Sequence, residues 1–205
     1  MKQRQPTRRG FSLIEFMIAI TISSTLLAAT MSALDISFKT YKSTTESASI
    51  NVATRLTMHR ITTLIRNGEE FGPYPVNPIL DPQITSNWIE FRAIIEPDSD
   101  PSLQVTQVWT ITRVDQSGEL GPYRIDAQIS TYRGTVQLGT TITQTVMYRV
   151  KELVFNLEYG VGPKLKRATI DLTVGPRQDQ ADTITTDVES RQIRMVSTVR
   201  PRRLQ

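Results

Sequence analysis

The feature that most constrains this chain is an uncharged run of nineteen residues at positions 16–34, FMIAITISSTLLAATMSAL. As a helix rising about 1.5 Å per residue, this run reaches about 28 Å, close to the hydrocarbon thickness of a bilayer. The ten residues that open the chain contain no acid and carry four positive charges, at Lys2, Arg4, Arg8 and Arg9. Because cytoplasmic flanks of membrane helices are enriched in Lys and Arg, the pattern predicts a cytoplasmic N-terminus, one membrane span and an exported remainder.

Composition excludes several classes of function. The net charge is +4, but outside the first ten residues the chain has twenty basic and twenty acidic residues, so the basic character belongs to the leader rather than to a nucleic-acid-binding face. The chain has no cysteine, which excludes disulfides, zinc–thiolate sites and a cysteine nucleophile. His59 is the single histidine, and the sequence contains no glycine-rich phosphate loop, metal-ligand spacing or paired catalytic motif. We therefore expect no enzymatic activity, no metal and no cofactor.

The apolar run could belong to a cleaved secretory signal peptide. Such a peptide needs small residues in an Ala-x-Ala pattern after the run, and the stretch LLAATMSALD offers none. The sequence therefore predicts that the apolar segment stays in the mature protein.

Glycine and proline indicate where the first helix ends. Neither occurs in residues 11–67, and then six of them crowd into residues 68–82. This pattern predicts one long helix that ends at about residue 67, with a possible kink or break in the Ser- and Thr-rich residues 43–47. Its second half is amphipathic, and the apolar side chains that share one face should pack on the following domain. They are Ile50, Ala53, Ile61, Leu64 and Ile65.

After Pro82 the apolar period changes from helical to alternating, which is typical of half-buried strands. The predicted strands are residues 88–95, 103–114, 123–130, 141–150, 152–159, 168–174 and, less regularly, 193–199; the polar residues 178–187 are predicted to form a loop. Six or seven strands without a second long helix predict an α+β fold in which the long N-terminal helix packs on an antiparallel sheet.

The junction between leader and span carries the most specific pattern, Arg8-Arg9-Gly10-Phe11-Ser12-Leu13-Ile14-Glu15. Gly10 allows an extended backbone to enter a tight protease site without a side chain. Glu15 places a carboxylate at the start of a membrane helix, where insertion costs up to about 2.5–3.5 kcal/mol. Such a residue is a functional-site candidate whose partner remains to be named.

This string closely resembles the N-terminal signature of type IV prepilins and pseudopilins, over residues 5–36. The resemblance implies a pilin-like fold, and cleavage between Gly10 and Phe11 by a prepilin peptidase that also methylates the new amine of Phe11. It also implies that Glu15 pairs with the terminal amine of a neighbouring subunit during assembly. Other pilin or pseudopilin subunits, an inner-membrane assembly platform and, before assembly, membrane lipid are the implied partners.

By resemblance, residues 1–10 are a cleaved leader, 11–36 a transmembrane and assembly helix, 37–67 its amphipathic continuation, and 68–205 a periplasmic β-rich domain. Shaft-forming pilins often carry a proline within the apolar helix and a C-terminal disulfide, and this chain has neither. The run at residues 55–66, the strand Trp88-Ile89-Glu90-Phe91 and the ending at residues 196–200 are similar to J-type minor pseudopilins and W-type minor pilins. These features favour a minor subunit.

Two smaller clusters leave alternatives open. The basic tail residues Arg200, Arg202 and Arg203 could contact DNA or another anion, so a DNA-binding subunit of an uptake pilus is the alternative function, although nucleic acid is not the expected partner. Asp98-Ser99-Asp100 could coordinate calcium, but it lacks the acid and glycine spacing of a calcium loop, which favours a polar turn. A plain signal-anchored β domain is the remaining alternative.

Overall fold

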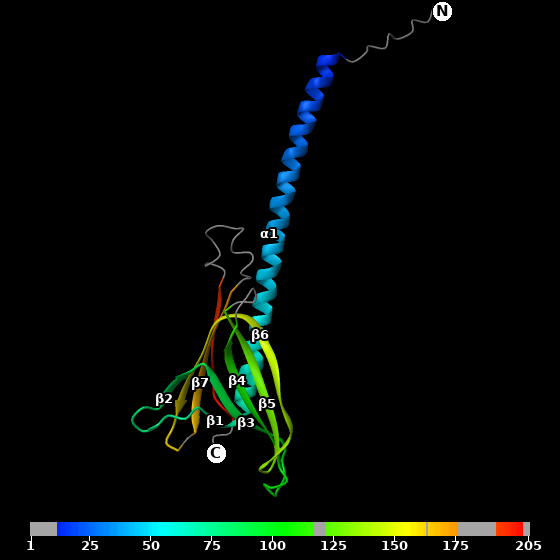
Figure 1. Cartoon of the computed structure of the whole chain (residues 1–205). Coiled ribbons are helices and arrows are strands. Elements are labelled where there is room, and N and C mark those ends of the chain that lie inside the picture. Colours follow the sequence, from blue (N-terminus) through cyan, green and yellow to red (C-terminus); the bar gives the residue numbers. More distant parts are fainter. Residues whose placement is uncertain (1–11, 117–121, 163, 176–191, 203–205) are drawn as a thin grey trace, which may run out of the picture. The chain divides into compact units, whose positions relative to one another are not determined.

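The computed structural model describes residues 12–116, 122–162, 164–175 and 192–202. It divides the chain into two compact units, residues 1–46 and 47–205, and each is described by itself. One helix, α1, contributes to both units, and all of the described strands belong to the second unit (Figure 1).

Helix α1 (Leu13–Asn67) comprises 55 residues and ends where glycine and proline return in the sequence. The backbone N–H of Gly68 donates to the carbonyl of Ile65 at 3.2 Å, which caps the last turn. The predicted end at residue 67 is confirmed. The helix continues without interruption through residues 43–47, so the Ser- and Thr-rich stretch does not break the backbone hydrogen bonding.

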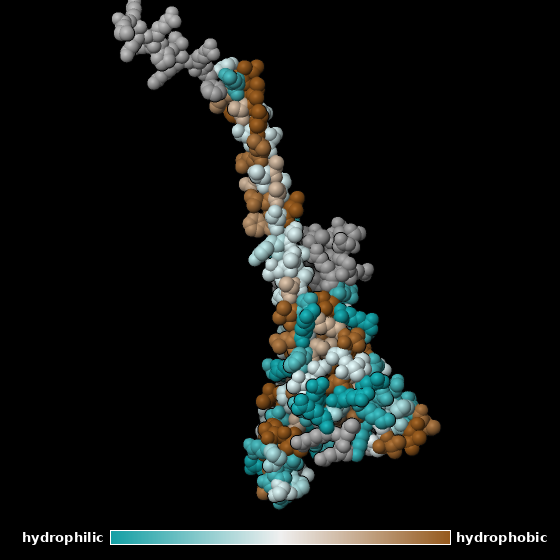
Figure 2. All heavy atoms as spheres, turned by 180° about the vertical axis from the view of Figure 1, so that it is seen from behind, coloured by the Kyte–Doolittle hydropathy of each residue, from teal (hydrophilic) through white to brown (hydrophobic). Residues whose placement is uncertain are grey.

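In the first unit, the large apolar side chains of the helix are exposed, among them Ile18, Leu26 and Phe38. Figure 2 shows apolar surface along the face of this part of the helix that is in view. This part of α1 is long and apolar enough to cross a membrane. Hydroxyl groups within it bond to backbone carbonyls one turn earlier, as when Thr21 Oγ1 donates to the Met17 carbonyl at 2.6 Å. A polar side chain satisfied in this way is compatible with a hydrocarbon environment.

The second unit is built on one antiparallel sheet of eight strands with the order β1-β3-β4-β5-β6-β7-β8, and β2 pairs with β6 outside this path. The strands are β1 (Glu69–Gly72), β2 (Gln83–Ser86), β3 (Trp88–Glu96), β4 (Val105–Asp115), β5 (Tyr123–Arg133), β6 (Val136–Tyr159), β7 (Leu165–Val174) and β8 (Ile193–Val199). The α+β class and the antiparallel sheet predicted from the sequence are both confirmed.

Strand β6 differs from the prediction of two separate strands at residues 141–150 and 152–159. It is one strand of 24 residues whose first part pairs with β5 and whose last part pairs with β7 and β2. The change of partner occurs where Arg149 adopts a positive φ of 62° and the register with both neighbours shifts. An irregularity of this kind redirects a strand without ending it. Strands β1 and β2, of four residues each, were not predicted, because they are too short to show a period.

The core of the second unit forms where the end of α1 meets the sheet. Ile61 and Ile65 of the helix are 1% and 0% exposed, and they belong to the same cluster as Phe91, Ile111 and Phe155 of the sheet. This contact confirms the predicted apolar helix face in its last two turns.

One member of the predicted helix face was wrong, because Ala53 is exposed. Thr54 and Thr57 are buried in its place, and the Thr54 hydroxyl donates to the Ile50 carbonyl at 2.7 Å. Polarity had excluded Thr54 and Thr57 from the expected stripe. A hydroxyl that bonds to its own helix leaves only a methyl group to face the core, so threonine is tolerated there.

We expect Ile61→Ala to lower the free energy of unfolding of the second unit by about 2–5 kcal/mol, because it removes a fully buried side chain. Leu56→Ala, on the same helix, is the matched control: Leu56 is 68% exposed, and we expect a change below about 0.5 kcal/mol. Denaturant unfolding of the full chain in detergent, followed by the fluorescence of Trp88 and Trp109, measures both. Equal effects of the two substitutions would contradict the packing described.

Tyr159 makes stability dependent on alkaline pH. Burial raises the pKa of its phenol well above the ordinary value, and Tyr74 packs against it with ring centroids 5.8 Å apart. Above a pH of about 10 the unfolded chain loses this proton while the folded chain keeps it, so stability falls as the pH rises. We expect Tyr159→Phe to lose less stability between pH 9 and 11 than the unsubstituted chain. Tyr148→Phe, at an exposed position, should leave the slope unchanged.

Candidate functional site

The first candidate site is the start of α1. Gly10 and Phe11, the predicted cleavage residues, and the leader charges Lys2, Arg4, Arg8 and Arg9 lie outside the described residues. Ser12 lies immediately before the helix, and its carbonyl accepts a hydrogen bond from the Phe16 N–H at 3.1 Å. Any reaction at the junction would therefore occur within two residues of a formed helix N-terminus.

Glu15 lies in the first turn of α1, and its Oε2 accepts a hydrogen bond from the backbone N–H of Ser12 at 3.2 Å. This is half of a capping box, in which the third helical residue reaches back to a free backbone donor. The carboxylate is also stabilised there by the positive end of the helix dipole. Its side chain is exposed, so the second oxygen remains available to a cation from outside the chain.

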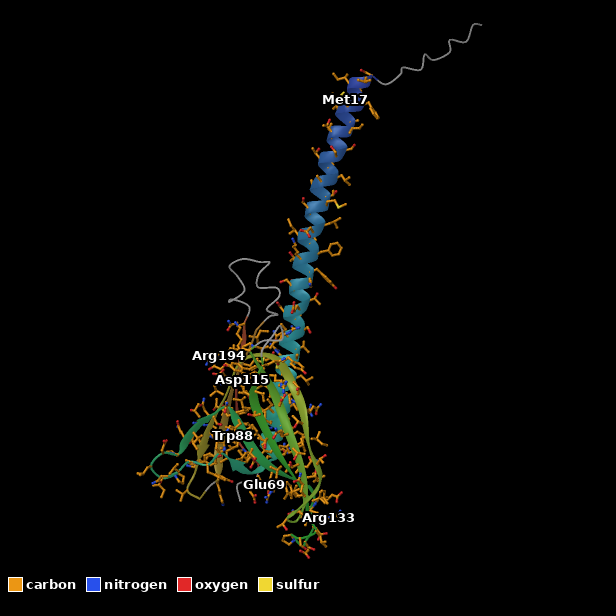
Figure 3. All side chains as sticks on the ribbon, viewed as in Figure 1. Met17, Glu69, Trp88, Asp115, Arg133 and Arg194 are labelled. Atoms are coloured by element: carbon orange, nitrogen blue, oxygen red, sulfur yellow. The ribbon has the colours of Figure 1, made fainter. Side chains whose placement is uncertain are left out.

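Figure 3 shows Met17 near the start of the exposed apolar part of α1, two residues after Glu15. From residue 16 to residue 34 no further charged side chain follows. Glu15 is therefore the only acid in the first 34 residues, and its position marks the boundary between a charged leader and an apolar helix.

The second candidate site is the basic C-terminal end. Arg200 and Arg202 are exposed, but the intervening Pro201 is buried, and Arg203 lies outside the described residues. The backbone N–H of Arg202 donates to the carbonyl of Arg66 at 2.8 Å, in the last turn of α1. This part of the chain is therefore attached to the helix by its backbone, while the side chains of Arg200 and Arg202 remain exposed to solvent.

Arg200 lines a pocket of about 250 Å³ together with Glu158 of β6 and with Lys166 and Arg167 of β7. Arg167 Nη2 contacts Glu158 Oε2 at 2.5 Å, across a register pair of the two strands. The sequence placed Arg200 in a tail with Arg202 and Arg203, whereas the fold brings it to two cations that lie 33 and 34 positions earlier. No sequence pattern links these residues, because their proximity depends on the pairing of β6, β7 and β8.

The acidic pair Asp98 and Asp100 lies on the exposed connection between β3 and β4. Asp98 Oδ1 accepts the Asp100 N–H at 2.9 Å, and Asp100 Oδ1 accepts the Ser102 N–H at 2.9 Å. Hydrogen bonds from the Ser102 N–H and hydroxyl lower the pKa of the Asp100 carboxyl. Together with the Asp98 bond they form the polar turn that the sequence favoured. No group of three potential metal-binding side chains occurs in the described part of the chain.

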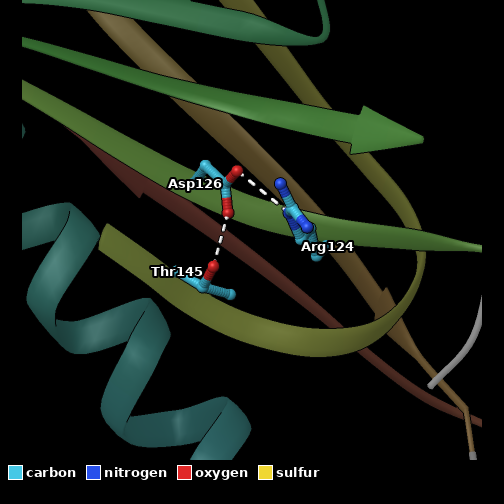
Figure 4. A network of polar contacts seen from close by, with 3 residues as sticks. All are labelled: Arg124, Asp126 and Thr145. Atoms are coloured by element: carbon cyan, nitrogen blue, oxygen red, sulfur yellow. Dashed lines mark hydrogen bonds and ion pairs between the residues drawn. The ribbon is translucent and has the colours of Figure 1, made fainter. Parts of the chain in front are cut away.

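One polar network was missed at the sequence level. Asp126 of β5 is 3% exposed, and its carboxylate accepts hydrogen bonds from Arg124 Nε at 3.0 Å and Thr145 Oγ1 at 2.9 Å (Figure 4). Alternation had placed it on a polar, solvated face. With an ion pair and a hydroxyl donor, the carboxylate is satisfied within the sheet, and the network ties β5 to β6 rather than forming a reactive site.

The geometry of the N-terminal segment agrees with a comparison against protein families. Residues 6–31 match the model described as the prokaryotic N-terminal methylation motif. The chain carries a type IV prepilin-like signature. The matched residues include Gly10, Phe11, Glu15 and most of the apolar run. Searches of the curated proteins and of the solved structures returned no match.

This prepilin-like signature has coarse functional consequences. The motif characterises structural proteins of the pilin and pseudopilin type rather than enzymes, and it implies processing by a peptidase and assembly with other pilin subunits. The apolar N-terminal helix fits a membrane-anchored pilin. The similarity to J-type and W-type minor subunits stays a prediction.

Proposed function

We propose that this prepilin-like chain is a minor structural subunit of a type IV pilus or of a type II secretion pseudopilus. A prepilin peptidase cleaves it after Gly10 and methylates the amine of Phe11. The observation that carries the proposal is the motif match over residues 6–31, followed by an exposed apolar helix long enough to span a membrane. The absence of cysteine, and of proline within the apolar helix, favours a minor subunit over a shaft-forming one.

Before assembly, residues 11–36 hold the subunit in the bacterial inner membrane, with the leader in the cytoplasm and residues 68–205 in the periplasm. The amphipathic residues 37–67 connect the two, and their last turns are packed on the sheet. An inner-membrane assembly platform then transfers the helix from lipid into the filament, where helices of neighbouring subunits replace the lipid. The sheet domain faces outward.

Glu15 is the proposed assembly residue. After cleavage, the α-amine of Phe11 has an ordinary pKa of about 7.7–8.0 and is cationic near neutral pH. In a filament core of low dielectric constant, a carboxylate attracts such an amine of the neighbouring subunit far more strongly than in water. An unpaired carboxylate in that core is strongly unfavourable, so the pair also selects the register between subunits. The hydrogen bond from the Ser12 N–H orients the carboxylate at the helix start.

A DNA-binding subunit of an uptake pilus is the alternative function, with Arg200, Arg202 and Arg203 as the contacts. The pocket that joins Arg200 to Lys166 and Arg167 supports an anion-binding role. The neighbouring surface carries charges of both signs, such as the Arg194–Asp171 pair, which does not favour an extended phosphate backbone. A plain signal-anchored β domain would require neither the motif nor Glu15.

We expect intact mass and N-terminal sequencing of the membrane form to show a chain that starts at methylated Phe11 only when prepilin peptidase is present. Gly10→Val should retain the leader, because a β-branched side chain blocks the tight site that glycine enters. Gln5→Ala, within the leader, is the control and should be processed normally. An uncleaved chain, or a cut near Ala33, would contradict the proposal.

We expect Glu15→Gln to leave processing intact but to lower the amount of the subunit in isolated filaments at least about tenfold, since the neutral amide cannot form the ion pair. Asp35→Asn is the matched control, because Asp35 lies just past the other end of the apolar run and pairs with Lys39 instead. Quantitative immunoblotting of sheared filaments measures both. If filaments contain as much of the Glu15→Gln subunit as of the unsubstituted one, Glu15 does not have the proposed assembly role.

A further inference from the structure

The pocket at the ends of β7 and β8 contains more positive than negative charge. Glu158 pairs with Arg167. Among the described residues, no carboxylate forms an ion pair with Lys166 or Arg200. Both side chains line the same volume of about 250 Å³, so two positive charges remain to be neutralised there. The Lys166 stem lies over Gly160, where an added Cβ would come within 2.9 Å of Lys166 Cε, so the absence of a side chain at Gly160 leaves room for this lysine.

The surroundings of the pocket define its ligand. The adjacent surface of β6, β7 and β8 presents neutral polar side chains, among them Asn156, Thr169 and Thr198. Farther along, Arg194 is neutralised by Asp171. A polyanion needs a continuous row of cations, whereas this patch offers a local excess of two charges in a hollow. It therefore suits one or two carboxylates of a protein loop.

The same chain carries a matching acidic loop. Residues 96–100 include Glu96, Asp98 and Asp100 and no basic residue. The turn bonds of Asp98 and Asp100 give the loop a fixed conformation before any partner arrives. A preformed loop loses less entropy on binding than a flexible one. The N–H of Gly134 in the β5–β6 turn donates to the Gln104 carbonyl at 3.0 Å, which holds the end of the β3–β4 connection that contains this loop.

The acidic loop and the pocket belong to different turns of the second unit. In Figure 1 the β3–β4 and β5–β6 turns lie at the lower right, and the β6–β7 turn lies at the lower left. Residues 96–100 are all exposed, so the loop is accessible to the pocket of another chain.

We propose that the pocket formed by Lys166, Arg167 and Arg200 receives the acidic loop, residues 96–100, of a second copy of the chain. The contact is heterologous, because each copy offers a loop and a separate pocket, and contacts of this kind build rings or helical filaments. The proposal rests on the proposed filament subunit and extends it with a contact between sheet domains. Two adjacent copies suffice to form it.

Cysteine cross-linking tests this contact in the full chain, because the chain has no cysteine of its own. Ser99→Cys places a thiol in the acidic loop, and Val161→Cys places one on the exposed β6–β7 turn beside the pocket. The two single-cysteine chains, carrying different tags, are co-expressed with the assembly system and oxidised. We expect the yield of the disulfide-linked dimer of differently tagged chains to be at least about fivefold higher than the yield of the dimer of identical chains.

Charge reversal then tests the chemistry. In the Val161→Cys chain, Lys166→Glu with Arg200→Glu should lower the cross-linked fraction at least about fivefold. Asp98→Lys with Asp100→Lys in the Ser99→Cys chain should restore at least about half of it. Restoration requires both partners to be folded, so it separates lost attraction from misfolding. Lys151→Glu, at an exposed lysine of β6 that does not line the pocket, is the matched control and should leave the yield unchanged.

The proposal would be overturned if no cross-link forms between copies, or if neither charge reversal changes the cross-linked fraction. Binding of duplex DNA that weakens with salt and is lost in Arg200→Glu would indicate that the pocket binds phosphate. If no cross-link forms in the same chain, this result would also overturn the proposal. N-terminal sequencing of the same samples distinguishes failure of the contact from failure of the proposed function. Cleavage after Gly10 without a cross-link would contradict only the proposed contact. An uncleaved chain would contradict the proposed function as a filament subunit.

Discussion

The structure depends on one continuous helix that must suit two different environments along its length. In residues 13–46 the apolar side chains of α1 are exposed, and beyond the first turn the backbone groups are hydrogen-bonded within the helix, as a hydrocarbon environment requires. Toward its C-terminus, Ile61 and Ile65 are fully buried against the sheet. A sheet needs an apolar layer on one face, and this end of α1 supplies it. Its first turn carries Glu15, which the helix N-terminus orients.

The sheet depends in turn on β6. Because this strand pairs with β5 along its first part and with β7 along its last, it unites strands that would otherwise form two smaller sheets. The change of partner at Arg149 occurs without a loop, so the hydrogen-bonded ladder continues to Tyr159. At that end Glu158, Lys166 and Arg200 come together, which makes the charged pocket a product of strand order.

Charge is distributed differently at the two candidate sites. At Glu15, one carboxylate borders an apolar helix and calls for a cation from another subunit. On the sheet, Asp171 and Asp126 already have arginine partners within the chain, whereas Lys166 and Arg200 have no carboxylate partner among the described residues. These two aspartates are already neutralised within the chain. The unpaired cations are the ones with binding capacity left for another molecule.

The sequence by itself determined the features that depend on local order. The uncharged run, the return of glycine and proline at Gly68 and the alternation in the later half predicted a long helix, its end and an antiparallel sheet. The junction at Gly10 and Glu15 identified the prepilin-like signature, because a peptidase reads contiguous residues. Only the tertiary structure decided that Thr54 enters the core while Ala53 does not, that β6 is one strand, and that Arg200 meets Lys166. These outcomes follow from pairing between distant segments, whose register depends on the whole packed sheet and leaves no periodic pattern in the residues themselves.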